Sequence, residues 1–385
     1  MIRTLTARTM EIDDTELAVQ EILEQLDLKN QLLDRSVGLM SCYSEFVESG
    51  VMAAICEALP FEIIGATTCC ADNDKDHDLM MLSLMVITSD ELELSIAYSE
   101  PLDSDVPEKL GTFYRQTKES LKGDPNLMIS YMPLLFNMGG DEIVAMLNEI
   151  TGDLVHFGTV AVDHLPNYDT AWTFANGEYS KDRMAIVLLS GNIQPKFILA
   201  QLSEENVDKH KALITASRGN VVMEVNGIPV AEYMESIGVT EQGRLESVNS
   251  VPYVVDFGDG TPPLVRAIYA FSPEGYAICG GVMPVNATLS VGSIDYVDVM
   301  RTTQQALSEV LEAGPKHGVL IFSCMARRFA LGVDVTAEME LINRVLPDGL
   351  PYQLAYAGGE ICPVYDAAGK PHTRFHNDTL VILVL

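Results

Sequence analysis

Basic residues are scarce in this sequence. Of its 385 residues, 24 are lysine or arginine and 55 are aspartate or glutamate, so the formal net charge is −31. A surface this acidic repels the phosphates of nucleic acids and of anionic lipids, so we expect neither as a partner. The same acidity is consistent with a cationic partner or a cation site, and also with a solubility requirement or a salty environment.

Long apolar runs are missing too. No stretch approaches the roughly 20 apolar residues that a membrane-spanning helix needs. Residues 1–33 are charged and amphipathic, without the apolar segment of a signal peptide. The seven cysteines are odd in number, and no CxxC motif occurs. We therefore expect a cytoplasmic protein with reduced thiols and no membrane insertion.

Several motifs of catalysis and cofactor binding are absent as well. The sequence has no GxxxxGK[ST] phosphate loop, no GxGxxG after a first strand, no GxSxG nucleophile turn and no HExxH zinc motif. Cys69 and Cys70 are adjacent, which is poor geometry for two ligands of one zinc ion. No kinase, cyclase or DNA-binding element is recognisable, so any signal has to pass through a partner protein.

A repeated order of elements is present instead. Val37–Cys42 (VGLMSC) resembles Gly318–Cys324 (GVLIFSC). Each is preceded by an amphipathic helix and followed by a helix, Leu–Pro, a strand, a loop and an apolar strand. A fainter copy of this order covers residues 106–189. We therefore predict a mixed α/β (α+β) fold of repeated α-β-α-β-β units, with pseudo-symmetry between the N-terminal and C-terminal copies.

The pattern changes after Lys196. Short strands joined by turns follow one another without helices, which is typical of antiparallel sheet. These strands are expected at Val251–Phe257, Leu264–Phe271, Tyr276–Gly281 and Thr288–Val291. The pattern breaks near residues 215–220, so we predict two closely packed domains, 1–217 and 218–385. Together they should form a layered sandwich of mixed sheets flanked by helices.

The long segment 163–183 is rich in aromatic residues and contains the only tryptophan, Trp172. An Asn–Gly pair at Asn176–Gly177 stands between strand-forming residues, which favours a β-hairpin over an open loop. Such a hairpin can still form the wall of a pocket.

Polar and reactive side chains gather near the C-terminus, between apolar strands expected at Val319–Phe322 and Leu380–Leu385. Loops at the ends of buried strands are where binding groups usually lie. We therefore predict a ligand site there, formed by Cys324, Arg327, Glu360, Cys362, His376 and Asn377.

Arg327 is the expected anchor, because a guanidinium presents a planar fork to a carboxylate or phosphate. Its alternative role is a structural ion pair with Glu360, because the repeat should place the strand ending at Ala357 beside the strand ending at Phe322. The arginines at 327 and 328 should lower the pKa of the Cys324 thiol and favour a reactive thiolate. Alternatively, Cys324 is a small core residue.

Three motifs in this region match a known family: FSC-x-x-R at Phe322–Arg327, GGEICP at Gly358–Pro363 and FHNDTL at Phe375–Leu380. With GNVVMEVNGIPVAEYMESIG at Gly219–Gly238, they make most of the chain resemble the FIST family of intracellular signal-transduction sensory domains. The two predicted domains are then FIST N-terminal-like and FIST C-terminal-like. In the N-terminal half, Cys69–Cys70 departs from the family's glycine-rich turn, so the ligand can differ from the family's usual one.

The resemblance implies a non-catalytic, cytoplasmic sensor without a cofactor. We expect its ligand to be amino acid-like or another small carboxylate, and its output to pass through a partner such as a kinase or cyclase. Because some members of the family are linked to haem and nitric oxide sensing, a haem ligand at His376 or His372 is one alternative. A thiol enzyme with Cys324 as nucleophile and His376 as base is another, and it requires the two within hydrogen-bond reach.

Overall fold

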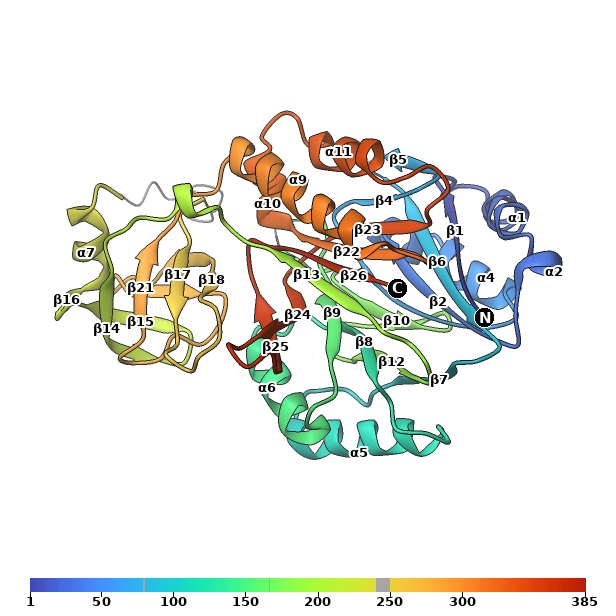
Figure 1. The fold of residues 1–385 in the computed structure, drawn as a ribbon, viewed down its shortest axis with the longest axis horizontal. Helices are drawn as coiled ribbons and strands as arrows, with labels where there is room; N and C mark the ends of the chain where they lie inside the picture. Colours follow the sequence, from blue (N-terminus) through green and yellow to red (C-terminus); the bar gives the residue numbers. More distant parts are fainter. Residues whose placement is uncertain (79, 166, 240–249) are drawn as a thin grey trace.

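The computed structural model describes residues 1–78, 80–165, 167–239 and 250–385. Helices cover packed sheets in a large body, formed by residues 1–200 and 295–385, and a smaller β-unit of residues 201–294 lies beside it (Figure 1). This mixed α+β architecture confirms the fold class expected from the sequence. None of the helices in the described ranges has the length and apolar content needed to cross a lipid bilayer.

The body contains three copies of one unit. In chain order, each copy has a first strand, one or two helices, a central strand, one or two further helices, a second strand, a hairpin and a last strand. The first copy comprises β1 (Ile2–Thr9), α1 (Thr15–Leu26), the short α2 (Leu28–Gln31), β2 (Arg35–Cys42), α3 (Ser44–Glu48), α4 (Val51–Ala58), β3 (Glu62–Thr67), β4 (Ala71–Asn73), β5 (Asp76–Asp78) and β6 (Leu82–Ser89).

The other two copies repeat this order, and the third is interrupted by the β-unit after its first strand. The second comprises β7 (Glu93–Tyr98), α5 (Val106–Glu119), β8 (Leu127–Met132), α6 (Gly140–Thr151), β9 (His156–Val160), β10 (Thr173–Ala175), β11 (Glu178–Ser180) and β12 (Ala185–Ser190). The third comprises β13 (Lys196–Ala200), α9 (Tyr296–Ala313), β22 (Val319–Cys324), α10 (Met325–Ala330), α11 (Ala337–Val345), β23 (Tyr352–Ala357), β24 (Glu360–Tyr365), β25 (Pro371–His376) and β26 (Leu380–Val384).

The three copies pair their strands in the same way. In each, the central strand runs parallel to the second strand and antiparallel to the last, which in turn pairs with the first. Cys42 and Cys324 take equivalent places, because each forms the last pair of its parallel ladder. The predicted pseudo-symmetry is therefore confirmed for the outer copies, and the middle copy shares it with Met132 at the matching place.

Each hairpin joins a sheet of another copy. The hairpin β4–β5 pairs with β23, β10–β11 pairs with β3, and β24–β25 pairs with β9. The hairpin β10–β11 is the one expected in segment 163–183, and its turn residues Asn176 and Gly177 have φ values of 51° and 89°. Such left-handed values at both positions are what a two-residue hairpin turn needs. This exchange of hairpins between copies ties the N-terminal and C-terminal copies into one body.

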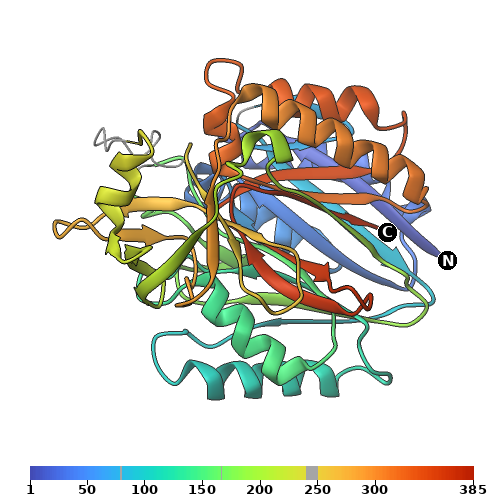
Figure 2. The same cartoon turned by 60° about the vertical axis from the view of Figure 1, so that its left-hand side comes forward.

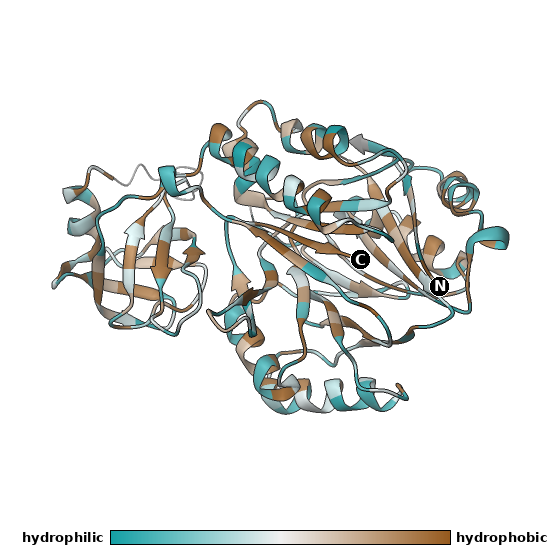
Figure 3. Cartoon of the chain, viewed as in Figure 1, coloured by the Kyte–Doolittle hydropathy of each residue, from teal (hydrophilic) through white to brown (hydrophobic). Residues whose placement is uncertain are grey.

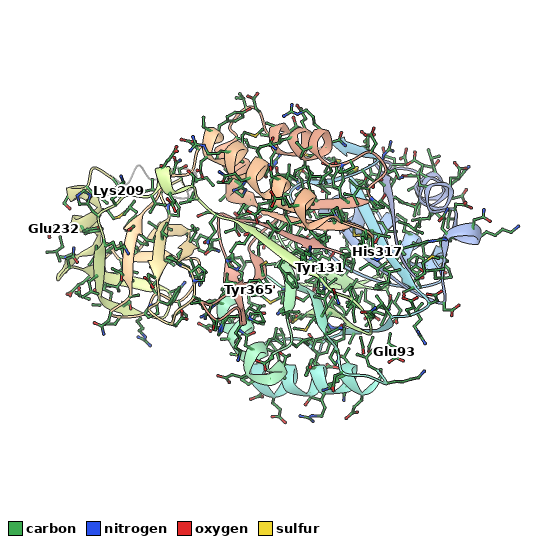
Figure 4. The ribbon with its side chains drawn as sticks, in the orientation of Figure 1. Glu93, Tyr131, Lys209, Glu232, His317 and Tyr365 are labelled. Carbon is green, nitrogen blue, oxygen red and sulfur yellow. The ribbon has the colours of Figure 1, made fainter. Side chains whose placement is uncertain are left out.

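The three sheets of the body face one another around an apolar centre. Tyr131, labelled near the middle of Figure 4, meets Phe322 edge to face at 5.9 Å between ring centroids. Phe157 stacks on Phe322 at 5.4 Å. Helices α1 and α4, α5 and α6, and α9 and α11 cover the outer faces. Hydrophilic residues lie along α5 and α9 (Figure 3). Because both faces of these sheets are covered, strands such as β22 are buried along their whole length.

The β-unit is an antiparallel sheet on which the helix α7 (Val230–Ser236) packs. Its strands are β14 (Ala212–Arg218), β15 (Val221–Val225), β16 (Ile228–Pro229), β17 (Tyr253–Asp256), β18 (Leu264–Arg266), β19 (Ile268–Phe271), β20 (Ala277–Cys279) and β21 (Thr288–Val291), preceded by a 3-10 turn at Glu204–Asn206. The antiparallel pattern expected after Lys196 is therefore present. The division predicted between residues 217 and 218 falls at the end of β14 and stays a prediction.

Candidate functional site

A pocket of about 490 Å³ lies where the body meets the β-unit, a junction that Figure 2 brings forward. The body contributes the loop Pro133–Gly139 after β8, the start of α6, and the ends of β22 and β23. The β-unit contributes residues of β19, β20 and the segment that follows β20. The turn between β25 and β26 completes the wall. Carboxyl ends of buried strands thus meet at the pocket, as ligand sites of α/β proteins often have them.

The pocket wall is mainly apolar and otherwise acidic. Carboxylates come from Asp141, Glu142 and Asp378, and phenol hydroxyls come from Tyr168 and Tyr269. None of the described residues that line the pocket is a lysine, an arginine or a histidine. Any charge that the wall carries is therefore negative.

Two of the six predicted site residues line this pocket, Cys324 and Asn377. Cys324 ends β22, and Asn377 begins the turn between β25 and β26. The amide nitrogen of Asn377 lies 3.5 Å from the Tyr269 hydroxyl, which belongs to the β-unit. The Asn377 side chain thus links the body to the β-unit. The other four predicted residues do not line the pocket: Arg327, Glu360, Cys362 and His376.

Asp378 follows Asn377 and is fully buried in the pocket wall. Its φ of 57° is left-handed, which is uncommon outside glycine and occurs more readily for aspartate and asparagine. Neither carboxylate oxygen has a hydrogen-bond partner among the described residues. Burial raises the pKa of this carboxyl from its ordinary 3.8 to about 7, although the Arg327 charge opposes the rise.

Glu360 and Cys324 are coupled to Asp378 by charge. Glu360 accepts a hydrogen bond from the Thr379 hydroxyl at 2.8 Å, while its Oε1 has no partner in the described part of the chain. Burial first, and the Asp378 charge second, raise the pKa of Glu360 well above its ordinary value. Burial and both carboxylates also raise the pKa of the Cys324 thiol well above its ordinary value. The expected lowering of this pKa by neighbouring arginines is therefore wrong.

Arg327 has a different partner from the one expected. Its Nη2 donates to Glu338 Oε1 at 2.7 Å, and neither side chain is exposed. Thr303 accepts a hydrogen bond from the same nitrogen at 2.8 Å, and Ser323 and Tyr356 donate to the other Glu338 oxygen. This closed buried network corrects the predicted pairing with Glu360. The strand adjacency behind that prediction is right, since β22 and β23 pair in parallel, but the helix α11 brings Glu338 closer.

The histidines are not placed to hold a haem in this pocket. His376 is fully buried outside the pocket wall, and its Nε2 is 3.0 Å from the Cys362 carbonyl oxygen. Burial lowers the pKa of His376 to about 3. His372 pairs with Asp366 at 3.0 Å near the opposite end of β25. Cys362 itself is a fully buried core residue. Nor does a hydrogen bond join Cys324 to His376 within the described residues.

Three parts of the pocket wall were not foreseen from the sequence. They are Asp378, the loop Pro133–Gly139 and Tyr269. Asp378 had a usable signal, because an acidic residue beside Asn377 stands two residues before a fully apolar strand. The other two had none, because their place in the pocket depends on how distant segments pack. No group of three or more His, Cys, Asp or Glu side chains in the described ranges could hold a metal ion.

The fold and the pocket together define a protein of repeated α/β units with a cavity where the body meets the β-unit. Family models agree with this at the level of sequence: the FIST N domain matches residues 36–228 and the FIST C domain matches residues 229–363. The chain therefore belongs to the FIST family, whose domains are sensory domains of signalling proteins. The family expected from the motifs is thereby confirmed.

Comparison with other proteins adds little beyond the family. Cyanuric acid hydrolase from A. caulinodans is similar over 100% of this chain and 99% of its own, with 9% sequence identity and a TM-score of 0.38. Phosphoribosylformylglycinamidine synthase II from Thermotoga maritima is similar over 99% of this chain and 71% of its own, with 10% identity and a TM-score of 0.18. At such values neither similarity supports a functional argument. No curated protein sequence matches the chain significantly.

Proposed function

We propose that this protein is a non-catalytic sensor that binds a small ligand in the pocket between the body and the β-unit. The observation that carries the proposal is a pocket of about 490 Å³ with a fully buried carboxylate, Asp378, that lacks a hydrogen-bond partner among the described residues. Small-molecule sites typically have volumes of roughly 300–1,000 Å³, apolar walls and a few polar groups. A ligand would supply the missing partner.

The position of the pocket suits a sensor, because polar contacts join the body and the β-unit beside it. Arg374 pairs with Asp259, and Arg266 donates to the Phe375 carbonyl at 2.9 Å. A ligand that touches both parts favours the arrangement in which both contacts are made. Its binding would therefore change how the β-unit sits on the body, which a partner protein can read.

The chemistry of Cys324 favours binding over catalysis. A thiol nucleophile needs a lowered pKa or an adjacent base, whereas burial and two carboxylates keep this thiol protonated. The amino acid-like or carboxylate ligand expected from the sequence depended on Arg327, and Glu338 occupies that guanidinium. In this proposal Cys324 and Asn377 line the pocket, and Asp378 is the main polar group that meets the ligand.

The remaining parts of the proposal concern the cell. We infer a cytoplasmic location and output through a partner such as a kinase or cyclase, because the two FIST domain matches together span residues 36–363. A net charge of −31 disfavours binding to nucleic acid or to anionic membranes.

A thermal-shift screen of the full chain against amino acids, organic acids, amines and haem tests the proposal. A ligand at about 100 times its dissociation constant adds roughly 2.7 kcal/mol of stability, which a melting curve resolves. Ile278 lines the pocket, so Ile278→Trp should abolish the shift. Val297 is 58% exposed on α9, so Val297→Trp adds the same side chain elsewhere and should preserve the shift. A shift that survives Ile278→Trp, or no shift with any compound, would count against the proposal.

A further inference from the structure

Unsatisfied acceptor atoms are concentrated at one end of the pocket. They belong to three side chains at most 1% exposed: Asp378 with both oxygens, Asn377 with Oδ1 and Glu360 with Oε1. Asn377 and Asp378 line the cavity directly, and Glu360 lies behind them in electrostatic contact with Asp378. Buried polar atoms in proteins nearly always have a hydrogen-bond partner. Asn377 Oδ1 and the ionised carboxylate of Asp378 accept hydrogen bonds, so a ligand that satisfies them has to supply donors.

The turn that carries these acceptors is held firmly in place. The Cys324 amide donates to the Thr379 carbonyl at 2.9 Å, and the Thr379 hydroxyl donates to Glu360. Gly280 of the β-unit packs so closely that an added Cβ would lie 2.4 Å from Asn377 Oδ1. These contacts hold the acceptors of the turn in a fixed position. They are fixed before a ligand arrives, which reduces the entropic cost of binding.

Among the described residues, neither of the nearby guanidinium groups donates a hydrogen bond to these acceptors. Arg327 pairs with Glu338, and Arg266 donates to backbone carbonyls of Val265 and Phe375. Both are absent from the pocket wall, whose charged members among the described residues are Asp141, Glu142 and Asp378. An anionic ligand would meet repulsion here, and a neutral one would leave the buried charge uncompensated.

Aromatic rings complete the environment. Tyr168, Tyr269, Phe136 and Phe375 line the same cavity, and the remaining wall is largely aliphatic. The faces of aromatic rings attract cations. The wall thus combines hydrogen-bond acceptors, negative charge and aromatic surface.

We propose, building on the sensory function above, that this pocket takes a small organic cation with N–H donors, such as a protonated amine, amidine or guanidinium on an apolar body. Its N–H groups donate to Asp378 and to Asn377 Oδ1, and its apolar part packs against the aromatic and aliphatic wall. A bare metal ion fits less well, because the described residues offer no group of three or more His, Cys, Asp or Glu ligands.

Matched probes that differ in one group test this proposal by isothermal titration calorimetry of the full chain at pH 8. Benzylamine, benzyl alcohol and benzoate form one set, butylamine, butanol and butyrate a second, and benzamidine is added as an amidine. We expect the cation of each set to bind at least about tenfold more tightly than its neutral and anionic analogues. Equal or tighter binding of the carboxylate or the alcohol, or of Mg²⁺ or Ca²⁺ titrated alone, overturns the proposal.

Three variants locate the binding. Asp378→Asn removes the charge but keeps a residue that tolerates a left-handed backbone. It should weaken the binding of the cations by about ten- to a hundredfold. Glu142→Lys at the exposed pocket mouth should weaken the binding of the cations and strengthen the binding of the carboxylates. Asp72→Asn is the control, because Asp72 is a buried carboxyl with an unpaired Oδ1 outside the pocket. Its cation affinity should equal that of the wild type.

The same data separate two kinds of failure. If a carboxylate binds the wild type but not Ile278→Trp, the proposal of a cationic ligand is refuted. The proposal of a sensory pocket then still stands. If no probe of any class binds, both the cation and the proposed function fail. Cation binding that Asp378→Asn and Glu142→Lys leave unchanged would place the cation elsewhere and overturn the assignment to this pocket.

Discussion

Arg327 donates a hydrogen bond to Glu338 at 2.7 Å in a network from which solvent is excluded. The guanidinium of Arg327, on the helix α10 that follows β22, therefore holds α11 against the third sheet. A residue of this type in a family motif looks like a ligand anchor, but its hydrogen-bonding groups are engaged inside the body. We propose that the turn of Asn377 and Asp378, which lines the pocket, has the binding role instead.

Replacement of Arg327 should therefore damage stability rather than binding specificity. Arg327→Met leaves Glu338 as an uncompensated buried charge, so we expect a loss of about 3–5 kcal/mol in the free energy of unfolding, measured in urea. Arg301 forms a more exposed pair with Glu205, so Arg301→Met should change stability by less than about 1 kcal/mol. A small loss in Arg327→Met combined with lost ligand binding would instead make Arg327 the anchor.

The free protein should become more stable when Asp378 loses its charge. The folded pKa of Asp378 is about 7 against an ordinary 3.8, so the unfolded chain releases this proton first as pH rises. Wild-type stability consequently falls between about pH 4 and 7 because of this group, by up to about 4 kcal/mol. Asp378→Asn lacks this loss and should melt at a higher temperature at pH 8, with little difference at pH 4.

This gain is opposite to what a structural carboxylate would show. If Asp378 were an acceptor needed by the fold, the variant would be less stable at pH 8 than the wild type. Melting curves of both proteins between pH 4 and 8 decide between the two. The titratable groups that interact with Asp378 are Glu360, Cys324, Tyr269 and Arg327. Glu360→Gln in the same series therefore shows how much of the pH effect is shared.

Close packing at Gly280 should matter for both stability and binding. A Cβ at this position would lie 2.4 Å from Asn377 Oδ1 and 2.8 Å from the Tyr269 hydroxyl. Gly280→Ala should therefore cost about 1–3 kcal/mol and weaken ligand binding by displacing Asn377. The matched control is Gly111→Ala in α5, where an added Cβ meets nothing within 4 Å. It should stabilise the protein by roughly 0.5–1 kcal/mol.

The Cys324 thiol should react slowly. Its raised pKa leaves little thiolate at pH 8, so alkylation by iodoacetamide should be at least about tenfold slower than that of free cysteine. Peptide mass spectrometry after timed quenching measures this rate at the single site. Alkylation faster than that of free cysteine would indicate an activated nucleophile and favour the thiol enzyme.

Much of the body could be predicted from local sequence pattern. The apolar runs around Val37–Cys42 and Gly318–Cys324 fix equivalent central strands, because both faces of these strands are covered. The exchange of hairpins could not be predicted. Asn176–Gly177 specifies a hairpin turn, but nothing local tells that its strands pair with β3 rather than with their own copy. That choice depends on how three complete units pack.

The site was predictable to a smaller extent. Cys324 and Asn377 line the pocket because strand ends and turns are where binding groups lie. The partner predicted for Arg327 is wrong. Strand adjacency favoured Glu360, whereas the buried face of α11 presents Glu338. The contributions of Tyr269 and the loop Pro133–Gly139 depend on the seating of the β-unit on the body, which no short motif encodes.

Hydrogen–deuterium exchange with the tightest compound from the screen tests the central claim most directly. If the ligand occupies the pocket, amides should gain protection in three segments that are distant in sequence: 133–142, 267–281 and 377–379. Ile278→Trp should remove all three effects together. Protection confined to other segments, with these three unchanged, would contradict a sensory pocket between the body and the β-unit.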